Sequence, residues 1–388
     1  MTRRVAITVP RYGPSLVGGM ERLARGLLTQ MAARGWQIEL LTTTALDHHT
    51  FKAALPTGME RSGAQTIRRF PVVWRDATRY RQLETRLVTT GALSPAEQEE
   101  WLFVGPHSPT LYDHLARHAA AYDLIFCLPY ASSMMQLAAW VAPERTLFIP
   151  CLHAEPYAAM APLRALLNSV WGVAWNSPEE AALAREGLAI APQREAVVGV
   201  GVDPLPPVAD AVSPADARAL LYCGRLEAGK NLGLLYRYLQ RYHDEGSDLR
   251  LWVAGDGPLR PPDHPAFRHL GWLTAEEQAR TYRRALALCQ PSRHESFSLT
   301  VMESWRAARP VLVHDQCAVT RGHVTRANGG LWFNSYDEFA SALDWLKANP
   351  AAAQQMGRNG ARYVSANYEW ESVMDRLEAL VEPLGVTR

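Results

Sequence analysis

Two glutamates, Glu295 and Glu303, stand eight positions apart in the stretch QPSRHESFSLTVMESWRAARP (290–310). Glu295 follows a short apolar run typical of a buried strand, and Glu303 falls inside a pattern typical of a helix. The start of that helix would offer free backbone N–H groups to an anion, at Ser298, Leu299 and Thr300. Because carboxylates beside an anion would repel it, we interpret both glutamates as acceptors of hydrogen bonds from hydroxyl groups.

Two cations are predicted to lie in a similar loop. The run ALLYCGR reads as a strand that ends near Arg225, and Lys230 precedes the helical run LGLLYRYLQRY. Lysine is scarce in this chain, which has only Lys52, Lys230 and Lys347. A loop with two cations at the end of a strand suits a diphosphate, because each cation forms charge-assisted hydrogen bonds with it.

The glycine-rich stretch GPSLVGGMER (13–22) also follows a strand and opens a helix. It lacks the spacing G-x-G-x-x-G, and the second strand ends in threonines without the acid that binds an NAD ribose. The stretch therefore does not predict a dinucleotide site. No D-x-D motif and no cluster of histidines and cysteines occurs, so no metal is predicted.

The composition is that of an ordinary globular chain. Its 388 residues exceed the size at which one core keeps growing, so two domains are expected. A formal charge of +1 argues against a nucleic-acid partner. The five cysteines form no C-x-x-C pair, which favours buried thiols in a reducing compartment. No apolar run is long enough to span a membrane, and we expect a cytoplasmic protein.

Strand and helix patterns alternate along the whole chain. Near the start, RVAITVP and QIELLTTT read as strands, and between them a helix is predicted to end at Gly35. Such alternation predicts βαβ units with parallel sheets covered on both faces. This alternation of strands and helices is interrupted by the proline-rich segment 201–216, which we interpret as a linker. Ligands of such sheets bind beyond the carboxyl ends of the strands.

Several of these stretches together resemble one enzyme family. GRLEAGKN, VAGDGP and PSRHESFSLTVMES, with GGMERLARGLLTQMAARG near the start, are similar to the motifs of glycosyltransferase family 4, retaining enzymes of the GT-B fold. The resemblance implies an α/β chain with two Rossmann-like domains whose parallel sheets face an interdomain cleft. The domains would be 1–200 and 217–367, with a C-terminal helix in 368–388 that packs back on the first domain.

The resemblance also implies roles for single residues. Glu295 would contact the donor sugar and Glu303 the ribose hydroxyls, while Arg225 and Lys230 would neutralise the diphosphate leaving group. His153, at the end of the run RTLFIPCLH, would lie on the acceptor side near the donor sugar. The catalytic set is then Glu295, His153, Arg225 and Lys230. Further donor contacts are implied at Gly18, Gly19, Gly255, Trp272, Leu273, Ser298, Leu299 and Thr300, and a further acceptor contact at Glu155.

We therefore predict a retaining glycosyltransferase that moves a sugar from a nucleotide-diphosphate donor to a hydroxyl acceptor, without metal or cofactor. The acceptor is a glycan, a lipid-linked saccharide or a small molecule. Two alternatives stay open: a GT-B epimerase or hydrolase of sugar nucleotides, and a protein that binds sugar nucleotides without catalysis. The sequence does not name the base or the sugar.

One basic region has two interpretations. Residues 61–86 contain seven arginines against two acids, interleaved with Phe70, Trp74 and Tyr80. Such a patch suits an anionic acceptor or the inner face of a membrane, to which the protein would bind peripherally. Alternatively, it is a solvated face whose long side chains cover apolar surface.

Overall fold

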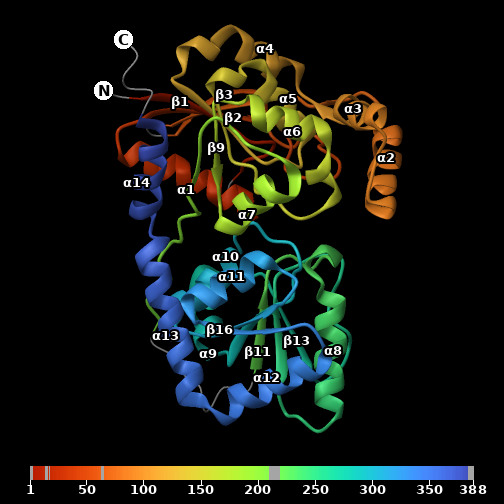
Figure 1. Ribbon diagram of the computed structural model, residues 1–388, viewed down its shortest axis with the longest axis vertical. Coiled ribbons are helices and arrows are strands. Elements are labelled where there is room, and N and C mark those ends of the chain that lie inside the picture. The colour runs from red at the N-terminus through yellow and green to blue at the C-terminus, as the bar shows by residue number, and fades with distance from the viewer. Residues whose placement is uncertain (1–2, 14–15, 17, 63–64, 209–218, 383–388) are drawn as a thin grey trace. The chain divides into compact units, whose positions relative to one another are not determined.

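The computed structural model describes residues 3–13, 16, 18–62, 65–208 and 219–382. The chain divides into two compact units, and each is described by itself. Unit 1 comprises Met1–Gly201 and Val373–Arg388, and unit 2 comprises Val202–Ser372. Each unit has its own sheet with helices against it (Figure 1). Of the predicted linker 201–216, residues 209–216 lie outside the described residues.

The sheet of unit 1 has eight strands, and all neighbours run parallel except β3 and β4. In spatial order the strands are β10 (Glu195–Val197), β9 (Gly172–Trp175), β8 (Thr146–Phe148), β7 (Leu124–Cys127), β1 (Arg4–Thr8), β2 (Gln37–Thr43), β4 (Gln65–Phe70) and β3 (Gly58–Ser62). A separate two-stranded pair joins β5 (Val73–Trp74) and β6 (Pro106–His107).

The helices of unit 1 cover both faces of this sheet; α1 and α4 lie on opposite sides of the strands (Figure 1). They are α1 (Gly19–Ala33), α2 (Ala77–Thr90), α3 (Pro95–Val104), α4 (Pro109–His118), α5 (Ser133–Val141), α6 (Ala161–Ser169) and α7 (Pro178–Ala182). In α1, Leu23, Leu27 and Met31 are buried at helical spacing. The helix ends just before Gly35, whose φ of +79° favours glycine.

The sheet of unit 2 has six strands, and all its pairs are parallel. Their spatial order is β13 (Phe267–Gly271), β12 (Arg250–Ala254), β11 (Ala219–Cys223), β14 (Ala287–Gln290), β15 (Val311–His314) and β16 (Gly330–Phe333). The helices are α8 (Leu232–Asp244), α9 (Ala275–Arg284), α10 (Leu299–Arg306), α11 (Ala318–Ala327), α12 (Tyr336–Ala348) and α13 (Pro350–Asn367). The predicted βαβ alternation is thus confirmed in both units.

The last described helix is α14 (Trp370–Val381), whose residues from Val373 onward belong to unit 1. Its Arg376 donates from Nε to the Val198 carbonyl at 2.9 Å. At its end, the Val381 carbonyl accepts a bond of 2.7 Å from the Arg3 guanidinium. The N- and C-terminal parts of unit 1 are therefore joined by hydrogen bonds as well as by packing.

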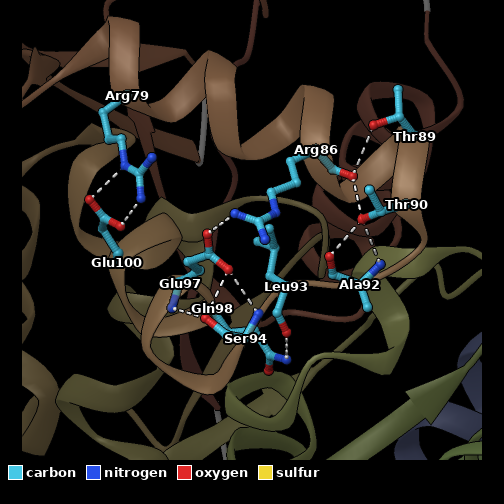
Figure 2. A network of polar contacts seen from close by, with 10 residues as sticks. All are labelled: Arg79, Arg86, Thr89, Thr90, Ala92, Leu93, Ser94, Glu97, Gln98 and Glu100. Atoms are coloured by element: carbon cyan, nitrogen blue, oxygen red, sulfur yellow. Dashed lines mark hydrogen bonds and ion pairs between the residues drawn. The ribbon is translucent and has the colours of Figure 1, made fainter.

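Residues 61–86 are not one continuous patch. They run from β3 through β4 and β5 into α2, and α2 packs against α3 around a small core of its own. Several of the arginines have acidic partners. Arg79 binds Glu100 and Arg86 binds Glu97, both across the α2–α3 interface at 2.6–2.8 Å (Figure 2). These pairs reduce the free positive charge that a membrane or an anionic acceptor would meet.

Two further points concern the whole chain. Each of the five cysteines is a free thiol, and Cys127, Cys289 and Cys317 are buried. Burial raises the pKa of the Cys151 thiol to about 12, so that thiol stays protonated at neutral pH. Within the described residues, no helix has the length and apolar character that crossing a membrane requires.

Candidate active site

The strand order of unit 2 reverses between β11 and β14. From β11 the chain continues outward to β12 and β13, and from β14 it continues in the other direction to β15 and β16. The loops after these two central strands therefore diverge, and such a switch point is where open α/β sheets bind ligands. The loop after β11 contains Arg225 and Lys230, and the loop after β14 contains Glu295. The topology thus brings these predicted residues to one place.

Lys230 and Glu295 form an ion pair across the switch point. Lys230 Nζ lies 2.8 Å from Glu295 Oε1, with the side chains only 25% and 10% exposed. A second bond joins the same loops: Asn231 Nδ2 donates to the Pro291 carbonyl at 3.0 Å. Asn231 adopts a left-handed conformation with φ of +56°, which asparagine tolerates better than most residues. The two loops are therefore held together by charge and by hydrogen bonding.

Of the two predicted cations, Arg225 is more exposed than Lys230. Its side chain is 47% exposed and lies 3.2 Å from the Glu227 carboxylate. The Arg225 carbonyl accepts a bond of 2.7 Å from the Tyr222 hydroxyl, which fixes the backbone. Burial, and next the charge of Glu295, raise the pKa of Tyr222 well above its usual range. Tyr222 therefore remains a hydrogen-bond donor at neutral pH, and the Arg225 side chain is left accessible to an anion.

Gly255 sets the position of the loop that carries Arg225. Its φ is +127°, and a Cβ atom there would lie 1.9 Å from the Gly224 carbonyl oxygen. The adjacent backbone is joined by bonds from Gly224 N to Ala254 O at 3.0 Å and from Leu226 N to Asp256 O at 3.0 Å. Such close approach of two backbones requires glycine. Gly255 thus acts through backbone shape, and its predicted donor contact stays a prediction.

Glu303 is buried, with an exposed fraction of only 3%. Its Oε2 accepts hydrogen bonds from the Tyr282 hydroxyl at 2.9 Å and from Gln278 Nε2 at 3.2 Å. Gln278 also lies 3.5 Å from Cys223 Sγ, at the end of β11. Sequence reasoning missed Tyr282 and Gln278, because only the tertiary packing of α9 against α10 brings them to this carboxylate. A ribose contact by Glu303 stays a prediction.

The N-terminus of α10 is organised by a residue that sequence reasoning also missed. Gln290, 4% exposed, donates from Nε2 to Thr300 Oγ1 at 3.1 Å and to Ser298 Oγ at 3.4 Å. Its Oε1 has no hydrogen-bond partner among the described residues. Ser298 itself is left-handed, with φ of +72°. The sequence signal that could have identified Gln290 is an amide side chain at the end of the apolar run ALALCQ, since buried polar groups need partners.

The first-turn amides of α10 have no preceding helical carbonyl to bind, which is true of every helix start. Leu299 and Thr300 supply such amides and are half-buried. They follow the loop that contains Glu295.

Trp272 is 59% exposed and Leu273 is partly buried, both directly after β13. Their predicted contact with a nucleotide base is untested.

The predicted residues of unit 1 also lie at a carboxyl edge. Gly18 and Gly19 begin α1, after β1, and the Glu21 carboxylate of that first turn binds Arg11 at 2.6 Å. Neither glycine has a positive φ, and a Cβ at Gly19 would meet nothing within 4 Å. Neither position therefore requires glycine for its backbone conformation, and the predicted donor contacts stay predictions.

His153 follows β8 and is held by an acid and a phenol. Its Nδ1 lies 3.5 Å from Glu155 Oε1, with the side chains 30% and 28% exposed. The Tyr130 hydroxyl donates to the same Glu155 oxygen, and the Tyr130 ring lies 6.2 Å from the imidazole, edge-on. The carboxylate lies on the Nδ1 side of the imidazole, so a ligand would approach the other ring nitrogen, Nε2. Tyr130 was not anticipated from the sequence.

Glu180 is a buried acid that shapes the backbone next to His153. Although only 1% exposed, its two oxygens accept bonds from the backbone N–H groups of Leu152 and Asn176. Burial raises the pKa of Glu180 to about 8, against the backbone hydrogen bonds, which lower it. Leu152 directly precedes His153, so Glu180 is a positioning residue for the loop after β8.

The Glu180 pKa predicts a pH dependence of stability. Because the folded-state pKa lies above that of an unfolded glutamate, the folded state binds more protons between about pH 4.5 and 8. The free energy of unfolding should therefore fall as pH rises through this window, with this group contributing at most about 1.4 kcal/mol per pH unit. In Glu180→Gln that contribution should vanish. Urea unfolding at pH 5, 6, 7 and 8 checks this, and parallel pH profiles for the two proteins would contradict it.

Among the described residues, no group of three or more histidines, cysteines or acids is arranged to hold a metal ion. The switch point combines the cations Arg225 and Lys230, the carboxylates of Glu227, Glu295 and Glu303, and the start of α10. Such a set can bind a phosphate-bearing ligand and accept hydrogen bonds from its hydroxyl groups.

Part of this chain matches a described protein family. Residues 217–349 match the family described as "Glycosyl transferases group 1". The alpha-D-kanosaminyltransferase of Streptomyces kanamyceticus is 24% identical over 182 residues, which cover 44% of this chain and 47% of that protein. The chain thus spans about half the length of the curated relatives it matches.

Solved structures match over the full length. Sucrose-phosphate synthase from Thermosynechococcus elongatus has a TM-score of 0.71 at 21% identity, covering 99% of both chains. "Trehalose-6-phosphate from E. coli bound with UDP-2-fluoro glucose" has a TM-score of 0.71 at 12% identity, covering 98% of this chain and 99% of that one. The fold is GT-B. In this GT-B chain the family match, 217–349, contains every predicted charged residue of the unit 2 site.

Proposed function

We propose that this protein is a retaining glycosyltransferase of family 4 that transfers a sugar from a nucleotide-diphosphate donor to a hydroxyl acceptor. The observation that carries the proposal is the Lys230–Glu295 ion pair at the switch point, 2.8 Å long and largely shielded from water. It stands between Arg225 on one loop and the start of α10 on the other. Such a cation would bind the diphosphate of the donor, and such a carboxylate would bind its sugar.

In the proposed reaction, the bond between the anomeric carbon and the diphosphate oxygen breaks, and a bond to the acceptor oxygen forms on the same face. Negative charge grows on the leaving diphosphate. Lys230, Arg225 and the first amides of α10 stabilise that charge, as preorganised donors do where charge develops. Glu295 accepts hydrogen bonds from the donor sugar, and Glu303 from the ribose. The acceptor proton leaves with the diphosphate.

The ion pair has a consequence for the proposed reaction. Lys230 must exchange part of its interaction with Glu295 for the diphosphate when the donor binds. The pair balances both charges, since an unpaired buried charge is costly. Glu295 is then already placed beside the anomeric end of the donor.

The comparisons support this proposal in two ways. The relative from Streptomyces is named a transferase of a sugar, and one structure of similar fold holds UDP-2-fluoro glucose. For the acceptor side we propose His153 and Glu155, whose loop follows β8 at the carboxyl edge of the unit 1 sheet. The thiols fit a reducing compartment, and we propose a cytoplasmic location.

A thermal-shift screen tests the proposal first. UDP-, GDP-, ADP- and TDP-sugars are each added to the full chain, and a donor that binds the native state should raise the melting temperature. Products are then analysed with the best donor and a panel of acceptors. A glycoside with retained configuration is expected. An epimerised donor, free sugar alone, or binding with no turnover would each replace the proposal with one of the alternatives.

A further inference from the structure

Aromatic and acidic side chains collect at the carboxyl edge of the unit 1 sheet, near His153. They come from elements that follow different strands. Trp74, Tyr80 and Glu84 follow β4, while Tyr130 follows β7 and Tyr157 follows β8. Because these strands are parallel, their carboxyl ends lie at one edge, where α/β sheets bind ligands.

The rings form a continuous row. Ring centroids lie 5.5 Å apart for Trp74 and Tyr80, 5.7 Å for Tyr80 and Trp101, and 5.8 Å for Trp101 and Tyr157. Tyr80 and Trp101, in the middle of the row, are buried, while Trp74 and Tyr157 at its two ends are partly exposed. Partly exposed aromatic rings held rigidly in this way offer an apolar surface to the C–H face of a sugar or a cyclitol.

Glu84 lies beside this row without a strong cationic partner. The Tyr157 hydroxyl donates to its Oε1 at 3.4 Å. Burial raises the pKa of this carboxyl, against hydrogen bonds with Tyr80 and Tyr157 that lower it. No lysine or arginine of the described residues forms an ion pair with Glu84, and the basic group that acts on it is His49. Burial therefore works against the charge of Glu84, and a ligand cation would restore it.

The absence of an arginine at Glu84 is informative because its own helix carries several. Arg79 and Arg86 are on α2 with Glu84, yet they point to α3, where Glu100 and Glu97 bind them (Figure 2). Glu84 is the one acid of α2 and faces the loop after β8 instead. Two of the three arginines of α2 are thus paired with acids of α3, while Arg81 is exposed and Glu84 faces the loop after β8.

A second carboxylate stands on the other side of Tyr157. Glu155 is bound by the Tyr130 hydroxyl and lies 3.5 Å from His153 Nδ1. Burial raises the pKa of Tyr157 above its usual range, and the charges of Glu84 and then Glu155 raise it further. Tyr157 is therefore flanked by two negative groups, and the proposed acceptor residue His153 is adjacent to the second.

We propose that this cluster is the acceptor site and that it selects an acceptor bearing an amine, such as an amino sugar or an aminocyclitol. The inference rests on the proposed function and goes beyond it by naming the acceptor class. An ammonium group would form a charge-assisted bond with Glu84 and approach the faces of Trp74 and Tyr157. A phosphorylated or carboxylated acceptor would instead meet two carboxylates, so the site disfavours it.

The test compares matched acceptors with matched variants. Glucosamine, glucose and glucose 6-phosphate differ chiefly in charge, and their binding to the full chain is measured by calorimetry without donor, as well as their KM with donor. Glu84→Gln should weaken binding of glucosamine about tenfold and that of glucose less than twofold. Glu84→Asp should retain the preference in part. Glu99→Gln, an exposed acid of the neighbouring α3, should change neither.

The outcomes distinguish failure of the inference about the acceptor from failure of the proposed function. A wild-type preference for glucosamine that Glu84→Gln removes supports the inference, even if no donor is ever turned over. Equal affinity for glucosamine and glucose, a preference for glucose 6-phosphate, or a loss that is the same for every acceptor would overturn it. Failure of every sugar nucleotide to bind would overturn the proposed function instead. Circular dichroism of Glu84→Gln and Glu84→Asp separates loss of binding from loss of fold.

Discussion

Replacing Lys230 by alanine should lower kcat/KM for sugar transfer by about 10²–10³-fold, which is the usual effect of removing one donor that stabilises a developing oxyanion. Two effects add in this variant. The diphosphate loses a charge-assisted partner, and Glu295, only 10% exposed, loses the cation 2.8 Å away that balances it. The unbalanced carboxylate then repels the incoming diphosphate. Steady-state kinetics with the donor found by thermal shift measures the loss.

The scarcity of lysine supplies a matched control. Lys347 lies in the same unit on α12, where its Nζ is 3.3 Å from the Tyr242 hydroxyl, remote in sequence from both loops of the switch point. Lys347→Ala should leave kcat/KM within about twofold of the wild type, since single surface substitutions have small effects. Equal activity in Lys230→Ala and Lys347→Ala would remove the basis of the proposed mechanism.

A double variant separates the two effects. In Lys230→Ala combined with Glu295→Gln, the carboxylate no longer repels the diphosphate, but the donor sugar loses its charged acceptor. If repulsion by Glu295 dominates the single variant, donor affinity should recover in the double variant while kcat stays low. Non-additivity of this kind is expected for two groups in direct contact. Donor affinity is measured by calorimetry in the absence of acceptor.

How much the sequence can predict depends on the range of the interactions involved. Strands such as β1 and β11 are local apolar runs, and the end of α1 at Gly35 is a local backbone signal, so both were predicted. That Lys230 and Glu295 lie at the same edge follows from parallel strands whose ends share that edge, a topological rule that the alternation of elements already implies. The ion pair between them was not predicted.

Longer-range features could not be predicted in this way. The basic stretch 61–86 contains its arginines in the sequence, but their partners on α3 become visible only when α2 and α3 pack. Tyr282 reaches Glu303 across 21 residues because α9 and α10 lie side by side. Nothing in the local pattern marks such a tyrosine, since one on a helix face is usually part of the core. Packing, not propensity, decides these contacts.

Gly255 combines a local backbone conformation with a close contact to a distant loop. Gly255→Ala should lower the free energy of unfolding by about 3–5 kcal/mol. Two costs combine. An alanine at φ of +127° is strained, and its Cβ would lie 1.9 Å from the Gly224 carbonyl oxygen, which cannot move without breaking the adjoining backbone bonds. Urea unfolding of the full chain, followed by tryptophan fluorescence, measures the change.

Gly246→Ala isolates the conformational part of this effect, so the difference between the two variants gives the steric part. Gly246 also has a positive φ, +105°, but a Cβ there would meet nothing within 4 Å. This variant should lose only the conformational strain, about 1–2 kcal/mol. Because the Gly224–Leu226 backbone holds Arg225, Gly255→Ala should also weaken donor binding at temperatures where it stays folded, whereas Gly246→Ala should not. If the two variants lose the same stability and neither loses donor affinity, the close approach of the two backbones does not position the site, and Arg225 would have to be held by Tyr222 alone.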